Sequence, residues 1–363
     1  MGSGEEELQW DALAAELALD FGAESSDEEL HDARPQATPA PAPPASVERR
    51  SRGQLTHAEF HSEFRHRKPV LLSGFASGWM ALSRWSSVEH LASLLGEDVL
   101  VLRSPDDRRF LKRDCEQEQR PFGDVVRELF VQPAATASER PPKEAVASRM
   151  YARSPLRAGL RAEVDLRDLQ QLVGETDSDI RSSGPSGDAK GGTRRSVFKD
   201  ENCGVWLGTA GNVTPLHYDL CHGFLVQVLG TKTVTYFEPD DYRYLYQRKE
   251  HPELSQVDLD AWRREQVSNR LQMAQQGVAA QAESIEPGGV DSTGGAASGS
   301  AHAKWPRFAE ATPRTVTLMP GDCLYTPPFW WHHVATSEHT PALSVLVPFD
   351  MSPEEPVHPA HFM

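Results

Sequence analysis

Apolar and polar residues alternate in short segments through much of the second half of the chain. From residue 204 onward, apart from one long polar interruption, glycine, proline and polar turns separate these segments. The segments are GVWLGTA (204–210), TPLHYDL (214–220), FLVQVLG (224–230), KTVTYFEP (232–239), TVTLMPGDCLYTP (315–327), WWHHVATS (330–337) and ALSVLVPF (342–349). Many short strands joined by tight turns predict a β-barrel or a double-sheet jelly roll.

Two capping signals predict helices ahead of this strand-rich part. Thr56 with Glu59 fits the S/T-x-x-E capping box, and Ser86 with Glu89 fits a second one. Two apolar segments in the same region are typical of strands, namely KPVLLSGF (68–75) and EDVLVLRS (97–104). The predicted fold class is therefore mainly β, with helices that flank the barrel.

Composition divides the chain into a tail and one domain. Residues 1–50 combine an acidic run with a Pro/Ala-rich stretch, which is typical of a disordered segment. The expected domain spans residues 54–355. Polar or small-residue stretches interrupt it, and we expect flexible insertions near 133–147, 174–195 and 264–304.

The formal charge of the 363-residue chain is −16 at pH 7. Residues 1–45 hold eleven acidic residues and one arginine, a balance of −10, which leaves −6 for the rest. This balance argues against a protein that binds nucleic-acid phosphates over a wide surface.

The sequence also bears on the compartment. The four scattered cysteines fit neither a zinc site nor a disulfide framework, and no apolar stretch is long enough for a membrane span. Together with the lack of a signal-peptide pattern, these features lead us to expect an intracellular protein, in the cytoplasm or the nucleus. The sequence does not indicate the oligomeric state.

The pair His217 and Asp219 is the first candidate for chemistry. On a strand, side chains two residues apart share a face. An imidazole and a carboxylate placed in this way supply two of the three ligands of the facial triad that holds non-haem Fe(II). The H-x-D pattern alone is weak, because it recurs by chance in many proteins.

A third ligand has to come from a distant strand. His222 follows closely after the pair, and we expect it in a turn or at the surface. His332 and His333 lie within an aromatic cluster on a predicted strand, and alternation allows either of them to face inward. A histidine in such a cluster is ordinarily a core residue, and the H-x-D pair on another strand favours the ligand interpretation.

Lys232 is a further candidate, because it begins the otherwise apolar strand KTVTYF. Burying a lysine without an anionic partner is costly. The residue is therefore either exposed at the end of the strand or the counter-ion of a carboxylate beside the metal. Thr214 and Tyr151 are candidates to add hydroxyl hydrogen bonds to the same group.

In combination these motifs resemble the JmjC/cupin hydroxylases, and within them the asparaginyl hydroxylases of the factor-inhibiting-HIF type. The resemblance covers about residues 55–350. It rests on four segments in the same order along the chain, which are GNVTPLHYD (211–219), GTK (230–232), YLYQRKEHPELSQVDLD (244–260) and GDCLYTPPFWWHHV (321–334).

The resemblance implies a double-stranded β-helix, a jelly roll with the metal between its sheets. It makes His217, Asp219 and His332 the Fe(II) ligands, with 2-oxoglutarate and O₂ as cosubstrates at the open positions. Lys232, Thr214 and Tyr151 would hold the distal carboxylate of 2-oxoglutarate. The aromatic residues expected to wall the site are Tyr218, Phe329, Trp330 and Trp331.

The sequence departs from the family pattern at two positions. Gly223 and Val347 stand where the asparaginyl hydroxylases have asparagines near the cosubstrate. Ser344 and Gln227 are candidates to substitute for them. These two departures affect how 2-oxoglutarate is expected to bind and which substrate is expected.

The leading hypothesis is an Fe(II)- and 2-oxoglutarate-dependent dioxygenase that hydroxylates a protein side chain. One alternative is an oxygenase that modifies tRNA or another RNA, which the acidic charge disfavours. A histone demethylase is another, and no zinc-finger reader module supports it. A non-catalytic cupin-fold binding protein is the third, favoured by the missing asparagines and disfavoured by the ligand set.

Overall fold

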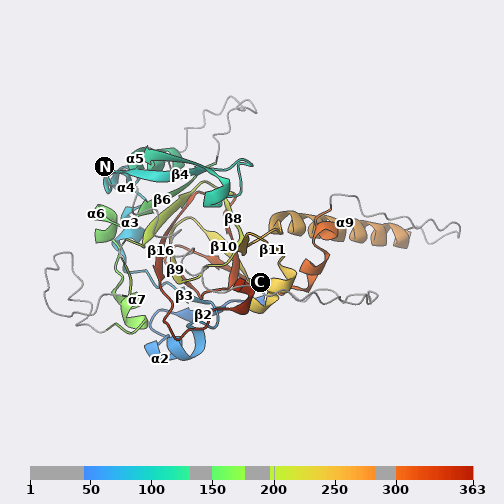
Figure 1. Ribbon diagram of the computed structural model, residues 1–363. Coiled ribbons are helices and arrows are strands. Elements are labelled where there is room, and N and C mark those ends of the chain that lie inside the picture. The colour runs from blue at the N-terminus through green and yellow to red at the C-terminus, as the bar shows by residue number, and fades with distance from the viewer. Residues whose placement is uncertain (1–44, 131–148, 176–196, 200, 283–299, 363) are drawn as a thin grey trace, which may run out of the picture. The chain divides into compact units, whose positions relative to one another are not determined.

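The alternating segments form eight β-strands, four in each of two sheets, in a computed structural model of the protein (Figure 1). The structure describes residues 45–130, 149–175, 197–199, 201–282 and 300–362. One sheet contains β8 (Val213–His217), β10 (Lys232–Phe237), β13 (Arg314–Leu318) and β15 (Trp331–Thr336). The other contains β7 (Gly204–Gly208), β9 (His222–Leu229), β14 (Cys323–Thr326) and β16 (Ala342–Phe349). The predicted class is confirmed: the protein is mainly β, and these strands form a double-stranded β-helix.

Further strands widen both sheets. The first sheet has seven strands in the order β1-β13-β10-β15-β8-β12-β11, and the second has nine in the order β2-β3-β14-β9-β16-β7-β6-β4-β5. The strands added to the first are β1 (Ala45–Ser46), β11 (Gln247–Arg248) and β12 (His251–Ser255). Those added to the second are β2 (Glu48–Ser51), β3 (Val70–Ser73), β4 (Asp98–Arg103), β5 (Glu116–Pro121) and β6 (Tyr151–Pro155).

Helices flank the barrel, and Figure 1 shows α3 to α7 gathered on the side of the nine-stranded sheet. Val125 and Leu160 from these helices share one buried cluster with Val226 and Val345 from the sheet. The α-helices are α2 (His57–Glu59), α3 (Met80–Arg84), α4 (Val88–Ser93), α5 (Phe122–Phe130), α6 (Ala158–Ala162), α7 (Arg167–Leu172), α9 (Leu259–Ala282) and α10 (Ala301–Lys304). The short helical turns are η1 (Phe60–Phe64), η2 (Lys112–Asp114), η3 (Pro239–Tyr244), η4 (Pro306–Glu310) and η5 (Pro359–Phe362).

A smaller apolar cluster fills the space between the two sheets. Leu71 and Leu324 enter it from the nine-stranded sheet, and Val234 and Val316 enter it from the seven-stranded sheet. Strand alternation makes this possible, because successive side chains point to opposite faces. Each central strand therefore has an outer face toward the helices and an inner face toward the other sheet.

The boundary of the N-terminal tail is corrected. Residues 45–50 were expected to belong to a disordered tail, whereas β1 pairs with β13 and β2 pairs with β3, in both cases in parallel. The partners of these short polar strands lie far along the chain, so local composition did not reveal the pairing. The rest of the tail lies outside the described residues.

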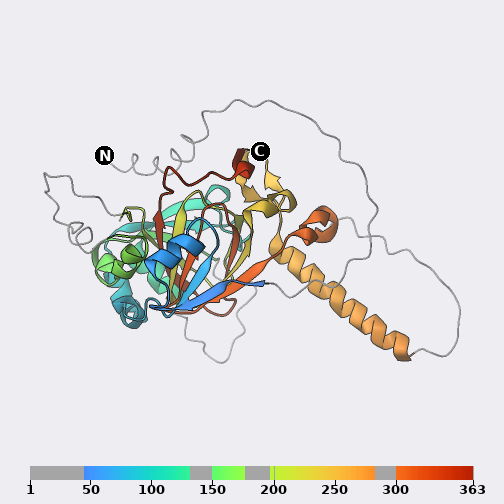
Figure 2. The same cartoon turned by 90° about the horizontal axis from the view of Figure 1, so that it is seen from below.

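The expected insertion near 264–304 is also corrected, because α9 runs through residue 282 and α10 begins at Ala301. Figure 2 shows α9 as a long helix that extends away from the sheets. Its first turn packs through Leu259 and Trp262, whereas Leu271 and Met273 are exposed. The sequence of α9 is rich in good helix formers but has no apolar stripe at helical spacing. The pattern of apolar residues therefore did not predict this helix. The expected insertions near 133–147 and 174–195 lie almost wholly outside the described residues.

The helix-start signals are confirmed in one case and corrected in the other. Thr56 and Glu59 form both hydrogen bonds of a capping box at α2. At α4 the cap is Ser87 instead of Ser86, and its hydroxyl accepts from the His90 N–H. None of the helices that the structure describes combines the length and the apolar character needed to cross a membrane.

Candidate active site

His217, Asp219 and His332 meet where β8 ends and β15 begins. His217 is directly opposite His332 in the antiparallel pairing of these strands, and the two ring centroids are 4.2 Å apart. One possible ligand atom from each of the three residues lies within 4.8 Å of the other two. The arrangement can therefore hold one metal ion between two imidazoles and a carboxylate, which is the facial triad of non-haem Fe(II) sites.

Asp219 reaches this position from a loop and not from a strand, because β8 ends at His217. The carbonyl oxygen of Asp219 accepts a hydrogen bond of 2.9 Å from the Phe329 N–H, which ties the loop to the turn before β15. Its carboxylate is half exposed and lies 3.7 Å from Nε2 of His332. The loop thus leaves one side of the candidate metal position open to a substrate.

Backbone carbonyls orient both histidines. Nδ1 of His217 lies 2.8 Å from the carbonyl oxygen of Pro215, and Nδ1 of His332 lies 2.9 Å from that of Trp330. When Nδ1 donates in this way, Nε2 carries the lone pair that a metal requires. Burial, and then the neighbouring His217, lower the pKa of His332, so its imidazole is neutral at physiological pH.

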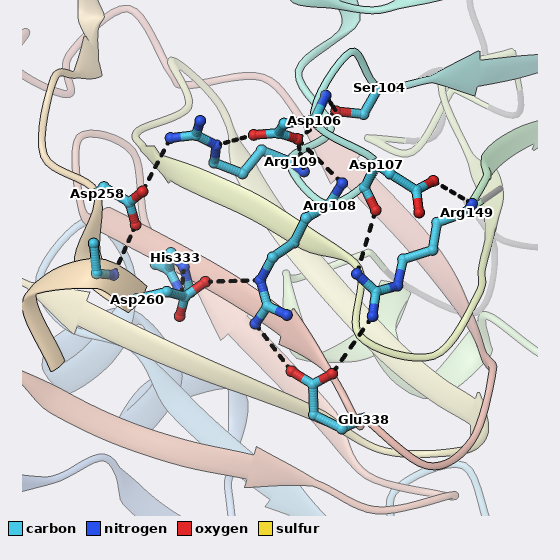
Figure 3. Close-up of polar contacts among 11 residues, drawn as sticks. Ser104, Asp106, Asp107, Arg108, Arg109, Arg149, Asp258, Asp260, His333 and Glu338 are labelled. Atoms are coloured by element: carbon cyan, nitrogen blue, oxygen red, sulfur yellow. Dashed lines mark hydrogen bonds and ion pairs between the residues drawn. The ribbon is translucent and has the colours of Figure 1, made fainter. Parts of the chain in front are cut away.

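His333 points to the other side of β15. It is 2% exposed, its Nε2 is 3.7 Å from Asp260, and a cavity of about 180 Å³ lies beside it. Figure 3 shows Asp260 between His333 and Arg108, within a network that continues through Glu338 to Arg149. Burial alone would raise the pKa of Asp260, but His333 and the nearby arginines outweigh this effect and lower the pKa to about 2. The structure therefore brings His332 to the trio and His333 to this outer network.

Lys232 is buried between the two sheets. Its side chain is 2% exposed, and Nζ lies 3.5 Å from the Tyr151 hydroxyl. Among the described residues no carboxylate forms an ion pair with it, and burial lowers its pKa to about 7. Burial raises the pKa of Tyr151, and a hydrogen bond with Thr214 opposes that effect. The structure thus brings Lys232, Tyr151 and Thr214 together.

The two candidates to replace the missing asparagines are already engaged with other groups. Ser344 donates to the side-chain oxygen of Gln227 at 2.8 Å, and the Gln227 amide donates to the carbonyls of Leu229 and Gly230. Both residues are fully buried. Their side-chain polar groups are thus satisfied within the protein.

Val347 was expected near the cosubstrate, and the structure corrects this. It lies in the apolar cluster under the helices and pairs with Phe224 of the same cluster, so it faces away from the inner side. Gly223 does lie on the inner face, because it alternates with Phe224 on β9. A side chain at Gly223 would contact Leu346.

The aromatic residues around the trio are buried. Tyr218 contacts Trp331 edge-on with ring centroids 4.7 Å apart, and Phe329 at 5.8 Å. Trp330 lies instead in the cluster between the sheets, with its ring 6.2 Å from that of Tyr236. The expected aromatic wall therefore divides between the two sides of β15.

His222 was expected in a turn or at the surface and is instead fully buried. Its ring nitrogens lie 2.8 Å from the Tyr325 hydroxyl and 3.0 Å from the carboxylate of Glu355. Both partners are more than a hundred residues away along the chain, so nothing near His222 signalled them.

Arg153 and Trp206, on the inner faces of β6 and β7, were also missed. The signal for Arg153 was its place two residues after Tyr151.

Comparison with known proteins gives a family and several distant relatives. A family model described as a cupin-like domain matches residues 56–355. Jumonji C domain-containing protein 5 of Drosophila melanogaster is 23% identical over 289 residues, which cover 79% of this chain and 56% of that protein. tRNA wybutosine-synthesizing protein 5 of Gallus gallus is 25% identical over 281 residues, which cover 77% of this chain and 70% of that protein. A solved structure of the Escherichia coli ribosomal oxygenase YcfD, in complex with cobalt and succinic acid, covers 84% of this chain and 53% of its own, with 11% identity and a TM-score of 0.39.

Proposed function

The chain belongs to the cupin-like domain family, and from this premise we propose that it is an Fe(II)- and 2-oxoglutarate-dependent dioxygenase that hydroxylates a protein side chain. The observation that carries the proposal is Lys232. A lysine that is 2% exposed, without an anionic partner among the described residues, is costly to bury. A carboxylate that binds beside it offsets this cost.

The donor set fits Fe(II). His217, Asp219 and His332 would hold the ion, since Nδ1 of each imidazole lies at a backbone carbonyl, which leaves Nε2 for the metal beside the Asp219 carboxylate. Fe(II) bound there supplies the redox chemistry that couples oxidative decarboxylation of 2-oxoglutarate by O₂ to hydroxylation of a C–H bond. The carbonyls of Pro215 and Trp330 keep the imidazoles in the required tautomer and orientation.

The other residues orient the cosubstrate. Lys232 neutralises the distal carboxylate of 2-oxoglutarate, while Tyr151 and Thr214 donate hydrogen bonds to it. The chelating end of the molecule then faces the metal. Burial of this pocket strengthens the ion pair, because the effective dielectric constant is lower there than in water.

We propose a protein side chain as the substrate. The second candidate is a modified RNA, which relatives named tRNA wybutosine-synthesizing protein 5 favour. The net charge of −16 disfavours RNA. An intracellular location, in the cytoplasm or nucleus, is part of the proposal, supported by four free cysteines.

Two measurements test the proposed function. Calorimetry of the Mn(II)-loaded full chain should detect 2-oxoglutarate binding that His332→Ala abolishes. With Fe(II), ascorbate and O₂, NMR should detect conversion of 2-oxoglutarate to succinate. Binding without succinate formation would indicate a non-catalytic binding protein, and absence of binding would refute the proposal.

Mass spectrometry of cells with and without the active protein then identifies the substrate. The expected product is a peptide that gains the mass of one oxygen atom. A modified nucleoside in place of a peptide would establish the RNA alternative, and loss of a methyl group would indicate demethylation.

A further inference from the structure

The inner face of β6 carries a second cation, Arg153. Tyr151 and Arg153 are two residues apart on this strand, so both side chains lie on the face that meets Lys232. Burial lowers the pKa of Arg153. No hydrogen bond or ion pair of its side chain exists among the described residues. A partly buried guanidinium with all its donors free is unusual, because each donor needs a partner once it leaves water.

Stacked rings connect Arg153 to the cosubstrate pocket. The guanidinium carbon lies 5.8 Å from the centroid of the Trp206 ring, and Trp206 stacks on Tyr151 at 5.0 Å. The Tyr151 ring in turn lies 5.5 Å from Nζ of Lys232. Trp206 and Tyr151 therefore separate Arg153, on the nine-stranded sheet, from Lys232, on the seven-stranded sheet, and of the two cations it is Lys232 that lies near the Tyr151 hydroxyl.

Arg153 leans along the sheet and away from Lys232. Tyr151 pairs with Gly208, Arg153 with Trp206, and Pro155 with Gly204. A Cβ atom added at Gly204 would lie 3.4 Å from Nε of Arg153, so the side chain crosses this glycine. Gly204 thus lies directly beside the arginine side chain, within van der Waals contact of a Cβ atom at this position.

The Arg153 side chain points toward the end of the barrel where the candidate metal position lies. Gly204 lies level with Leu346 on β16, and Leu346 would contact a side chain at Gly223. Gly223 pairs with Thr326, whose hydroxyl is hydrogen-bonded to that of Tyr236. Tyr236 pairs with His332 across β10 and β15, with ring centroids 6.0 Å apart. These pairings place Gly204 level with the metal-binding end of the barrel, and the Arg153 side chain points toward Gly204 from the level of Tyr151.

We infer that Arg153 binds a carboxylate of the primary substrate, an Asp or Glu side chain of a peptide, and so sets which neighbouring residue lies at the metal; this rests on the proposed function. The two carboxylates of 2-oxoglutarate already have partners, one at the metal and the other at Lys232. A planar guanidinium binds a carboxylate through two parallel hydrogen bonds. Arg153 thus acts as a specificity-determining residue.

A phosphate of RNA would offer similar chemistry, but the chain carries a net charge of −16. A polyanion has to overcome this repulsion over many phosphates, whereas a peptide with a single acidic side chain experiences little of it. We therefore assign an acidic peptide as the ligand.

Peptide binding by the full chain loaded with Mn(II) and N-oxalylglycine, a 2-oxoglutarate isostere that does not turn over, tests this inference. The probes are two pools of short fluorescein-labelled degenerate peptides, matched except that one contains Asp and Glu where the other contains Asn and Gln. Fluorescence polarisation should show that the wild type binds the acidic pool more tightly by about tenfold, the value of a charge-assisted hydrogen bond. Arg153→Gln should remove the preference, and Arg153→Lys should retain part of it.

Arg157→Gln is the matched control, because Arg157 lies just beyond the same strand, is exposed and pairs with Glu97. It should keep the preference, and both glutamine variants should bind N-oxalylglycine as the wild type does. Equal binding of the two pools, or a preference that survives in Arg153→Gln, would overturn the inference. Loss of N-oxalylglycine from Arg153→Gln would also overturn it, by assigning the arginine to the cosubstrate.

Two further outcomes separate the alternatives. An Arg153-dependent preference for a labelled RNA stem-loop over the acidic peptides would overturn the peptide assignment in favour of a phosphate ligand. If the wild type bound no N-oxalylglycine but still preferred acidic peptides, the proposed function would fail while the assignment of Arg153 stood.

Discussion

Replacing Lys232 with methionine should stabilise the ligand-free protein and weaken its binding of 2-oxoglutarate. Lys232 is 2% exposed and has no anionic partner among the described residues. Methionine has a similar length and no charge, so it fills the same space without the cost of burying an ammonium group. Most substitutions of a fully buried residue destabilise a protein, so a change in the opposite direction is a specific signature.

The pKa of Lys232 gives the size of the effect. Burial lowers it from 10.5 to about 7, which corresponds to about 5 kcal/mol at about 1.4 kcal/mol per pKa unit. The substitution removes only part of this cost, because the surroundings relax around the charge. Apolar replacement of buried charged groups has stabilised proteins by about 1–4 kcal/mol. We expect a gain in the free energy of unfolding in this range.

Loss of the partner of a buried carboxylate costs about 2 kcal/mol or more, so 2-oxoglutarate affinity should fall about thirtyfold or more.

The sign of the pH dependence follows from the lowered pKa. Below pH 7 the lysine is charged in the folded and the unfolded state, so the full cost of burial is present. As the pH rises from about 7 toward 10.5, the folded protein loses this proton first and the cost disappears. The stabilising effect of Lys232→Met should therefore be largest below pH 7 and fade above it.

Urea unfolding at several pH values measures the stability, and calorimetry with 2-oxoglutarate on Mn(II)-loaded protein measures the affinity. Wild-type affinity should be constant below pH 7 and should fall above it, with proton uptake on binding, because only the charged lysine pairs with the carboxylate. Lys249→Met, at an exposed lysine, is the control and should change neither quantity. Clear destabilisation of the Lys232 variant at acidic pH, or unchanged affinity for 2-oxoglutarate, would refute the reasoning.

Four other substitutions, in three experiments, test separate parts of the structure. His332→Ala should abolish Mn(II) binding, measured by electron paramagnetic resonance, whereas His333→Ala should largely retain it; the reverse result would reassign the ligand. Tyr151→Phe removes one hydrogen bond and should weaken 2-oxoglutarate binding in calorimetry by about 1–2 kcal/mol, while an unchanged affinity would place the hydroxyl outside the pocket. Glu163→Gln should lower the free energy of unfolding in urea by about 2–4 kcal/mol, because the buried carboxylate bonds Arg84, Trp85 and His90; an effect below about 0.5 kcal/mol, typical of surface positions, would contradict this.

The barrel strands could be predicted from the sequence because each carries its own local signal. In β10 the alternating residues Val234 and Thr235 face opposite sides, and glycine or proline turns bound most of the neighbouring segments. The short strands β1 and β2 carried no such signal, because their pairing with β13 and β3 depends on distant residues. The same limit explains His222, whose partners Tyr325 and Glu355 are remote in the chain.

The site residues could be predicted where a residue type is unusual for the sequence that surrounds it. A lysine at the start of an apolar strand and an H-x-D pair are visible in the sequence, and the structure brings Lys232 to the inner side and His217 and Asp219 to the trio. Alternation could not choose between His332 and His333, because it fixes only that they point in opposite directions. That choice depends on the pairing of β15 with β8, which places His332 opposite His217. Arg153 was missed because its position two residues after Tyr151 is a signal only once β6 is known to be a strand whose inner face carries Tyr151.

Gln227 and Ser344 bear on the proposed binding of 2-oxoglutarate in the absence of the two asparagines. The Gln227 amide donates to the carbonyls of Leu229 and Gly230, in the turn that leads into Lys232. Gly230 has a positive φ of 66°, and a Cβ atom there would lie 2.2 Å from the carbonyl oxygen of Pro341, so no other residue fits this turn. Ser344 fixes Gln227 in turn. These residues therefore fix the backbone that leads into Lys232, the residue to which the proposed function assigns the distal carboxylate.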